Sequence, residues 1–318
     1  MGYPLIYRYP QNRRIKRGSV MMRFGGFCLC FCALLLAASQ SAARSLEDIQ
    51  ASGYIEFAVY RDFPPYSQLV DGKPEGIDID LGKAIAERLA LKPRWMWVTA
   101  DETVDDDLRN AIWKGNVIER RVADVMLRVP YDRRYSYARD GYGLPRNDLV
   151  VMLAPYHTES WRIARNLDKI GDVRNLAIFQ YQPIGVELDS LPDFFLSGFL
   201  GGRLRDNVRH YIRIQQATAD LLEGKISAVA GMRTQLEWTL NASGENIDID
   251  SDGLETMGSL DWDIGIAIRH DFRPLGYRLE SVIKALIDEG LVENIFARYG
   301  AGYARPSLYS SAPQNAAN

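Results

Sequence analysis

The sequence predicts an α/β protein built in two successive parts. Segments rich in aromatic and β-branched residues alternate with segments whose apolar residues recur at helical spacing, which favours parallel strands joined by crossover helices. The alternation starts again after residue 148. The chain has 318 residues, of which 47% are apolar and 25% charged, so it can form one large or two medium domains.

The first part begins with a capped helix. Ser45, with Asp48 three residues later, is typical of a helix N-terminus, and Gly53 ends the helix. Residues 54–60 (YIEFAVY) have the composition of a strand, and two prolines exclude regular structure from residues 61–67. The same criteria predict helices at 81–91 and 105–114 and strands at 95–98 and 123–127.

The second part repeats this alternation. Its helix at residues 217–223 is ended by Gly224, and a long closing helical region at 275–298 is broken near Gly290. Short apolar runs predict strands at 149–153, 176–179, 226–230 and 264–268.

An export signal precedes these elements. Residues 1–43 contain six basic residues and no acid, followed by an apolar run at 24–38 and by Ser-Ala-Ala at 41–43. This order predicts a secretory signal cleaved near Ala43 and therefore a periplasmic protein. A membrane anchor is the alternative, but a spanning helix needs about twenty apolar residues. Met21 or Met22 remains open as the start.

The mature chain is acidic and free of cysteine. Cys28, Cys30 and Cys32 all belong to the leader, so 275 residues with a formal charge of −9 remain after cleavage. That charge argues against a nucleic-acid partner, and disulfides and His/Cys metal sites are excluded. We expect a monomer.

The sequence lacks the motifs of common enzymes. It contains no nucleophile elbow, P-loop or dinucleotide fingerprint, and its three histidines are scattered. We therefore expect a non-enzyme without a resident cofactor or metal. Asp248 to Asp252 resembles the first half of a calcium loop, but Ser259 stands where the bidentate glutamate belongs, which favours an acidic surface turn.

Several motifs together resemble one protein family. Three of these motifs lie early in the mature chain, namely SLEDIQASGYIEFAVY, RDFPPYS and GKPEGIDIDLGKAIAERL. Three more follow later, namely LLEGKISAVAG, DIGIAIRHDF and IFARYG. In this order and spacing they resemble the type II periplasmic solute-binding proteins, family 3. The resemblance implies two α/β lobes, two hinge strands near 149–153 and 258–268, and a ligand cleft between the lobes. Lobe 1 would comprise 44–148 and 262–303, lobe 2 would comprise 149–261, and 304–318 would be a disordered tail.

The resemblance also implies ligand-binding positions in lobe 1. Phe63 and Tyr66 occupy the loop whose aromatic residue covers the ligand in the family. Arg133 matches the arginine that grips the ligand carboxylate, but Pro130 replaces the family's threonine.

Lobe 2 departs further from the family pattern. Tyr181 and Gln182 stand where we expect the family's Gly-Thr-Thr turn, which binds a carboxylate. Met232, followed by Arg233, stands where the family has the aspartate that pairs with an α-ammonium group. With Arg128, Arg133 and Arg134 nearby in the expected cleft, these changes favour an anionic, planar ligand over an ordinary amino acid.

The stretches DDLRNAIWKG and ADVMLRVP are similar to binding-protein-like accessory components of periplasmic quinoprotein dehydrogenases. The first hypothesis is capture of a small anionic solute for an ABC importer. The second is an accessory protein that binds pyrroloquinoline quinone (PQQ) or a methanol or alcohol dehydrogenase. A dehydratase-like enzyme is the third, with Asp132 as its only candidate acid.

Overall fold

The computed structural model describes residues 43–310, except residues 119, 242–245 and 252. The predicted export signal lies outside the described residues, apart from Ala43. Within the described part, no helix combines the length and apolar character needed to cross a membrane.

The described strands form one nine-stranded sheet and a separate hairpin. The sheet order is β4-β1-β5-β11-β6-β9-β7-β8, with β10 paired to β6. Its strands are β1 (Tyr54–Tyr60), β4 (Lys92–Val98), β5 (Val125–Pro130), β6 (Val150–Asn166), β7 (Ile184–Glu187), β8 (Val208–Tyr211), β9 (Ala228–Met232), β10 (Ile247–Asp250) and β11 (Asp261–Arg269). The hairpin consists of β2 (Gln68–Val70) and β3 (Lys73–Glu75).

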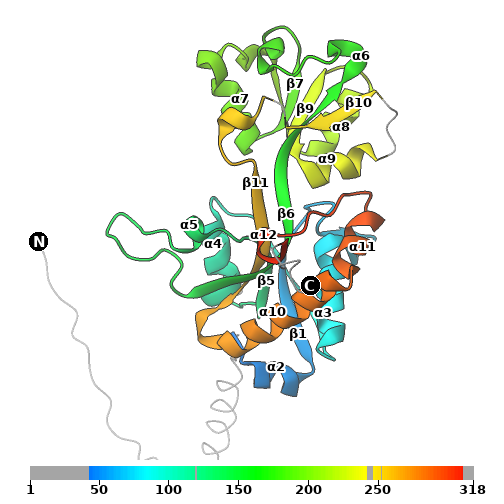
Figure 1. Ribbon diagram of the computed structural model, residues 1–318. Helices are drawn as coiled ribbons and strands as arrows, with labels where there is room; N and C mark the ends of the chain where they lie inside the picture. Colours follow the sequence, from blue (N-terminus) through cyan, green and yellow to red (C-terminus); the bar gives the residue numbers. More distant parts are fainter. Residues whose placement is uncertain (1–42, 119, 242–245, 252, 311–318) are drawn as a thin grey trace, which may run out of the picture. The chain divides into compact units, whose positions relative to one another are not determined.

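Two parallel blocks make the two lobes of this α/β fold. β1 runs parallel to β4 and β5 in lobe 1, and β7 runs parallel to β8 and β9 in lobe 2. The long strand β6 joins them, because residues 150–160 pair with β11 and residues 161–165 pair with β9. β6 and β11 are therefore the two hinge strands (Figure 1), and the predicted fold class is confirmed.

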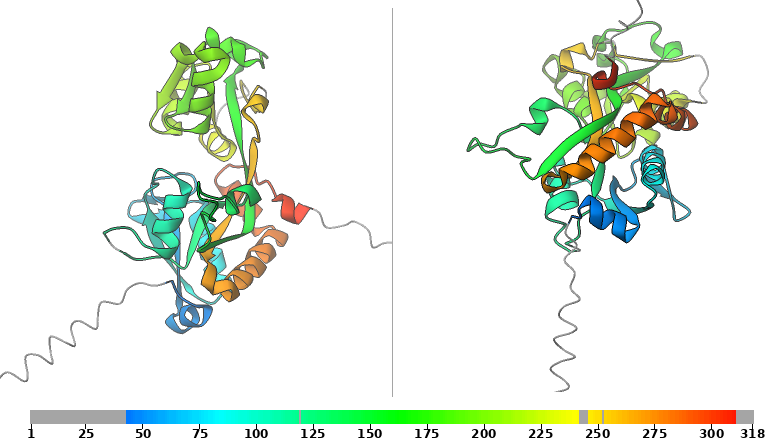
Figure 2. Two further views of the ribbon diagram at one scale, coloured as in Figure 1. Left: turned by 90° about the vertical axis from the view of Figure 1, so that its left-hand side faces the viewer. Right: turned by 60° about the horizontal axis from the view of Figure 1, so that its bottom comes forward.

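Helices cover both faces of each block (Figures 1 and 2). The helices are α2 (Leu46–Ser52), α3 (Ile77–Arg88), α4 (Val104–Leu108), α5 (Arg133–Ser136), α6 (Leu167–Ile170), α7 (Leu191–Gly202), α8 (Ile214–Leu222), α9 (Arg233–Leu240), α10 (Arg273–Asp288), α11 (Leu291–Arg298) and α12 (Ser307–Ser310). A π-helical segment (Arg109–Trp113) extends α4, and short 3-10 segments lie at Leu176–Gln180, Arg205–Asn207, Glu255–Met257 and His270–Phe272.

Local sequence signals account for several helix ends. Ser45 and Asp48 form the predicted capping box of α2, and Gly53 ends this helix with a φ of 71°. Gly290, also left-handed, separates α10 from α11 as predicted. The predicted strand at 176–179 is wrong, because Asn175 caps a 3-10 segment there.

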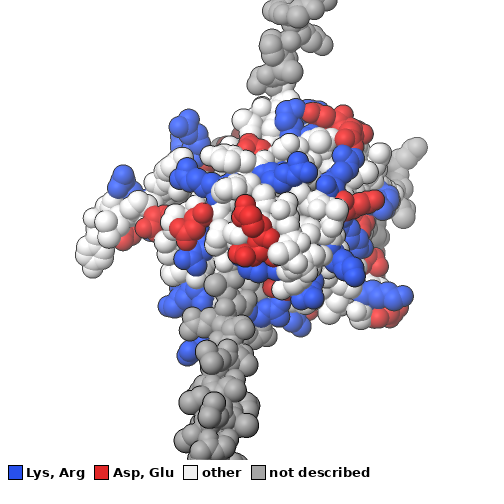
Figure 3. All heavy atoms as spheres, turned by 90° about the horizontal axis from the view of Figure 1, so that it is seen from below, with Lys and Arg blue, Asp and Glu red and all other residues white. Residues whose placement is uncertain are grey.

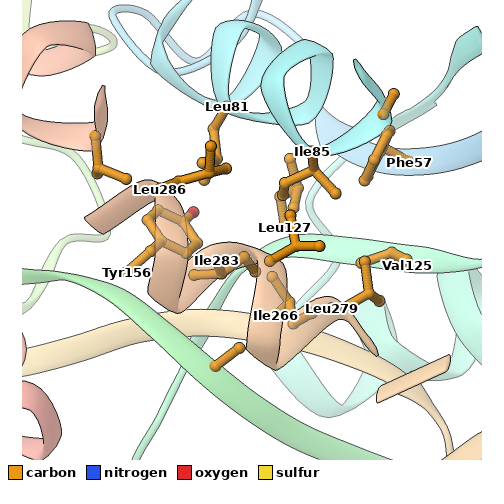
Figure 4. Close-up of a cluster of buried hydrophobic side chains, with 14 of the residues drawn as sticks. Phe57, Leu81, Ile85, Val125, Leu127, Tyr156, Ile266, Leu279, Ile283 and Leu286 are labelled. Carbon is orange, nitrogen blue, oxygen red and sulfur yellow. The ribbon is translucent and has the colours of Figure 1, made fainter. Parts of the chain in front are cut away.

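Alternate residues of β1 enter two different cores of lobe 1. Phe57 and Val59 pack with α3, α10 and α11, whereas Ala58 packs with α4 and the π-helical segment. Figure 4 shows the first core, where Leu81 and Ile85 of α3 face side chains of α10. Lobe 1 thus draws its core from segments near both ends of the described chain. The lobe boundaries at 148/149 and 261/262 stay predictions.

The segment before residue 311 is structured. Ala304 accepts a hydrogen bond from the Thr158 amide on β6, and residues 307–310 form α12. The prediction of a disordered tail is therefore wrong for residues 304–310. Sequence composition misses these contacts because they depend on a strand nearly 150 positions away.

Charges of both signs share the surface of lobe 1. On the face drawn in Figure 3, lysine and arginine side chains are interspersed with aspartate and glutamate. This face therefore presents no continuous basic area of the kind that binds a phosphate backbone.

Candidate functional site

A cavity of about 510 Å³ lies where several strands of the sheet end. Its walls come from the segments after β1 and β4 and the end of β5, from Glu187 and Met232 at the ends of β7 and β9, and from Trp262 and Ile264 of β11. A smaller hollow of about 180 Å³, lined in part by residues 188–190, shares Glu187 and Met232 with it. We call the two together the cleft. It occupies the carboxyl ends of parallel strands, where α/β sheets usually bind ligands.

Aromatic side chains line two sides of the cleft. In lobe 1, Tyr60 and Phe63 meet edge to face with ring centroids 5.9 Å apart, and Phe63 packs on Tyr66 at 4.9 Å. On the hinge strands, the rings of Trp161 and Trp262 lie 5.1 Å apart. Aromatic side chains thus line the cleft both from lobe 1 and from the hinge strands.

The charged groups that line the cleft are mostly acidic. They are the carboxylates of Asp62, Asp101, Glu102, Asp107, Glu187 and Asp189 and the guanidinium groups of Arg61 and Arg128. Six carboxylates thus face two arginines. A cleft with this excess of negative charge attracts cations and repels anions.

Two of these carboxyl groups sit in partly desolvated positions. Burial raises the pKa of Asp107, although its side chain accepts hydrogen bonds from the Tyr60 hydroxyl and from the Asp101 amide. Burial also raises the pKa of Glu187 at the end of β7. A positive group placed in the cleft would favour the charged form of both.

Arg128 is neutralised within the protein. Its Nε donates to Asp78 Oδ2 at 2.7 Å and its Nη2 to Asp78 Oδ1 at 3.1 Å, with both side chains at most 5% exposed. Its guanidinium carbon lies 3.3 Å from the centre of the Tyr66 ring. The Tyr156 hydroxyl completes the network, because it donates to Asp78 and accepts from the Arg128 amide. Arg128 therefore has little free capacity to bind an anion.

A second buried network connects lobe 1 to lobe 2. The Tyr66 hydroxyl donates to Glu159 Oε2 at 2.7 Å, and Glu159 Oε1 accepts from the Thr234 amide near the start of α9 at 3.3 Å. Glu159 belongs to hinge strand β6 and is fully buried. One carboxylate thus contacts the lobe 1 loop and the first turn of a lobe 2 helix.

His157 lies next to this carboxylate and makes stability depend on pH. It is fully buried, and burial, followed by the charges of Arg128 and Arg233, holds its pKa well below the ordinary value. Unfolding frees this imidazole to take up a proton below its unfolded pKa of about 6.5, so stability is lost as pH falls through that value. We expect a loss of about 1.4 kcal/mol between pH 7.5 and pH 5.5.

Urea unfolding at the two pH values measures this loss. The His157→Gln variant should lack the His157 contribution while keeping the other two histidines, so its pH dependence should be weaker by about the same amount. An identical pH dependence in both proteins would contradict the assignment.

The comparisons with known proteins agree with this geometry. Residues 55–301 match the family of bacterial extracellular solute-binding proteins, family 3. The chain belongs to this family. An L-arginine-binding protein of Pseudomonas aeruginosa is 23% identical over 268 residues, which cover 83% of this chain and 95% of the relative.

Solved structures show the same fold. An ancestral cationic amino acid solute-binding protein has a TM-score of 0.61 and 17% identity, covering 80% of this chain and 98% of its own. An arginine-bound amino acid ABC transporter substrate-binding protein of Streptococcus pneumoniae has a TM-score of 0.54 and 17% identity, with the same two coverages. The two-lobed fold of the solute-binding proteins is thereby established for this chain.

In this family 3 protein, three of the predicted site residues lie at or beside the cleft. Phe63 and Arg128 line it, and Tyr66 is buried behind Phe63. Arg133 lines a neighbouring open hollow of about 1160 Å³, which shares Trp262 with the cleft and also contains Asp132 and Arg134. Asp132, the candidate acid, caps α5 by accepting from the Tyr135 amide at 2.8 Å.

Tyr181 and Gln182 lie before β7 rather than after it. The Tyr181 side chain is 79% exposed, and the amide oxygen of Gln182 accepts from the Ser227 hydroxyl just before β9. The turn that follows β7 and enters the cleft is formed by residues 188–190, with Ser190 as the cap of α7. The sequence prediction used the wrong turn because it placed the strand at 176–179.

Arg233 is engaged elsewhere in lobe 2. It begins α9, lies 3.6 Å from Glu237 and donates to the Gly302 carbonyl at 3.1 Å. It is absent from the walls of the cleft. The predicted arginine cluster is therefore dispersed over three places.

The calcium-like sequence forms part of a strand. Asp248 and Asp250 lie on β10, where Arg174 pairs with both and Arg165 pairs with Asp250. Asp252 lies outside the described residues. Among the described residues, no group of three or more histidine, cysteine or acidic side chains could hold a metal ion.

Sequence reasoning missed most of the residues that line the cleft. Trp262, Asp107 and Glu187 come from three elements that are far apart in sequence. Glu187 carried a usable signal, because it ends an apolar run (IGVE) directly before a Ser-capped helix. Asp107 carried no such signal, because acidic residues are common in the first turn of a helix.

Proposed function

We propose that this family 3 protein captures a small organic solute other than an ordinary α-amino acid, in the periplasm, and presents it to an ABC importer. The observation that carries this proposal is the pairing of Arg128 with Asp78, which leaves one free arginine, Arg61, among the residues that line the cleft. Met232 also stands where the family resemblance implies an aspartate for the α-ammonium group. In the cleft walls an amino acid would therefore find neither the arginine nor the aspartate that the family resemblance implies for its two ends.

The described relatives bear on the ligand only indirectly. Two of them are described as binding arginine and one as a cationic amino acid binding protein. A positive ligand charge fits the acidic lining of this cleft. The expected anionic ligand gains no support, since Arg133, Arg134 and Arg233 lie outside the cleft walls. PQQ, a tricarboxylate, would meet the same excess of carboxylates.

The second candidate is an accessory role on a periplasmic quinoprotein dehydrogenase. The observation that favours it is a segment that projects from lobe 1, residues 137–149, which we call the arm (Figures 1 and 2). Tyr142 and Leu144 on this arm are 93% and 62% exposed. Tyrosine and arginine are enriched where proteins dock, and the arm also carries Arg139 and Arg146. A dehydratase role lacks such support, because Asp132 serves as a helix cap.

Thermal unfolding of the purified protein with a panel of solutes tests the first proposal. None of the twenty common amino acids should raise the unfolding temperature, whereas the true solute at 100 times its Kd should add about 2.7 kcal/mol of stability. Mass spectrometry of the purified protein should identify any solute retained from the cell. Stabilisation by an ordinary amino acid, arginine above all, would overturn the proposal.

Titration of a purified quinoprotein dehydrogenase tests the accessory role separately. If that role holds, the protein should bind the enzyme, and Tyr142→Ala should weaken the complex while leaving solute-dependent stabilisation unchanged. Absence of a complex would remove the second candidate.

A further inference from the structure

Part of the cleft wall is apolar and aromatic. Phe63, Val104, Met232, Trp262 and Ile264 all line it, and none of these side chains offers a strong hydrogen-bond acceptor. Trp262 is backed by Trp161, and Phe63 by Tyr66. A ligand inside the cleft is therefore next to aromatic side chains on the lobe 1 side and on the hinge side.

Carboxylates share the cleft walls with these apolar side chains. Asp62, Asp101 and Glu102 are exposed to solvent, while Asp107 and Glu187 are held in less solvated positions. Their charge faces the cavity without an equal number of basic groups, because Arg128 is bonded to Asp78. The arrangement combines a negative potential with polarisable rings.

A positive ligand satisfies both parts of this arrangement. A cation over the face of a tryptophan, tyrosine or phenylalanine is attracted by the ring quadrupole, and the attraction grows when water is excluded. The surrounding carboxylates attract the same charge over a longer distance. An anion would gain neither contribution, and it would face six carboxylates with Arg61 as the one unpaired arginine of the cleft walls.

The apolar wall also selects the kind of cation. A primary ammonium group has three N–H donors and loses free energy when they are buried without acceptors. The side chains of Phe63, Trp262 and Ile264 supply none. A cation whose nitrogen carries alkyl groups has few or no donors, and its methyl groups add favourable apolar contact.

We propose that the cleft of this protein binds an alkylated organic cation, such as a quaternary ammonium compound, through the rings of Phe63 and Trp262 and the carboxylates around them. This proposal rests on the solute-binding role proposed above and names the chemical class of the solute.

Matched ligands isolate the role of the charge. Calorimetric or tryptophan-fluorescence titration of the full protein would use tetramethylammonium, choline, and 3,3-dimethylbutan-1-ol, the neutral carbon analogue of choline. At least one of the two cations should bind, and choline should bind at least about tenfold more tightly than its neutral analogue. Failure of both cations to bind, or equal affinity for choline and its analogue, would overturn the proposal.

Matched variants isolate the role of the residues. Trp262→Ala should weaken cation binding by about tenfold, whereas Trp262→Phe, which keeps a ring, should stay within about threefold of the wild type. Glu187→Gln keeps the shape of the side chain but removes its charge. It should weaken the binding of choline and leave the binding of the neutral analogue unchanged. Tyr142→Ala, on the distant arm, is the control and should leave affinity unchanged. Wild-type cation affinity in both Trp262→Ala and Glu187→Gln would contradict the proposed site.

The results also separate this proposal from the broader one. If a neutral or anionic solute stabilises the protein and no cation binds, the solute-binding role stands and the cation proposal fails. If only ordinary amino acids bind, the proposed function itself fails.

Discussion

Replacing Asp78 with alanine should lower the free energy of unfolding by about 3–5 kcal/mol. Asp78 and Arg128 form a two-point ion pair with almost no exposure to solvent. Loss of the carboxylate leaves a buried guanidinium group without a counter-charge, and such a group cannot regain its hydration in place. The Tyr156 hydroxyl would lose its acceptor as well. Urea unfolding followed by circular dichroism measures the change.

Two comparisons show whether the loss comes from the unpaired charge. The double variant Asp78→Leu/Arg128→Met removes both charges, and it should recover much of the stability lost in Asp78→Ala. Arg88→Ala breaks the pair with Glu289 on the surface of lobe 1, where both side chains are more than 40% exposed, and should cause no measurable change. A cost below about 1 kcal/mol for Asp78→Ala would mean that Arg128 is solvated instead.

The same pair explains why the fold could be predicted and the ligand charge could not. The alternation of strands and helices depends on local spacing, and the sequence displays it directly. Arg128 was identified as a cleft residue, but its partner lies 50 positions earlier, at the start of α3. No local pattern shows that the two meet. An arginine that looked available to an anion is therefore already bound.

The acidity of the cleft was hidden for a related reason. Its carboxylates come from loops after β1, β4 and β7 and from α4, and each of them alone resembles an ordinary surface acid. Topology brings these loops together at one edge of the sheet. In lobe 2 the misplaced strand at 176–179 moved the expected turn by about half a dozen residues, so Tyr181 and Gln182 replaced residues 188–190 as candidates.

Replacing Gly76 with alanine should be at least as destabilising as loss of Asp78. Gly76 has a φ of 133°, which L-residues rarely adopt, and an added Cβ would overlap the Tyr66 carbonyl and lie 2.8 Å from the Ser67 nitrogen. Backbone atoms cannot rotate away as a flexible side chain can. We expect a loss of about 4 kcal/mol or more, measured by urea unfolding.

Gly72→Ala is the matched control, because it separates backbone strain from overlap. Gly72 has a φ of 75° in the β2–β3 turn, and a Cβ there would meet no atom within 4 Å. This variant should lose only about 1 kcal/mol, the cost of a left-handed alanine. Equal losses in both variants would exclude the overlap as the cause. If Gly76→Ala still folds, its ligand affinity should fall too. The loop that the added Cβ would displace places Phe63 in the cleft wall and Tyr66 against Arg128.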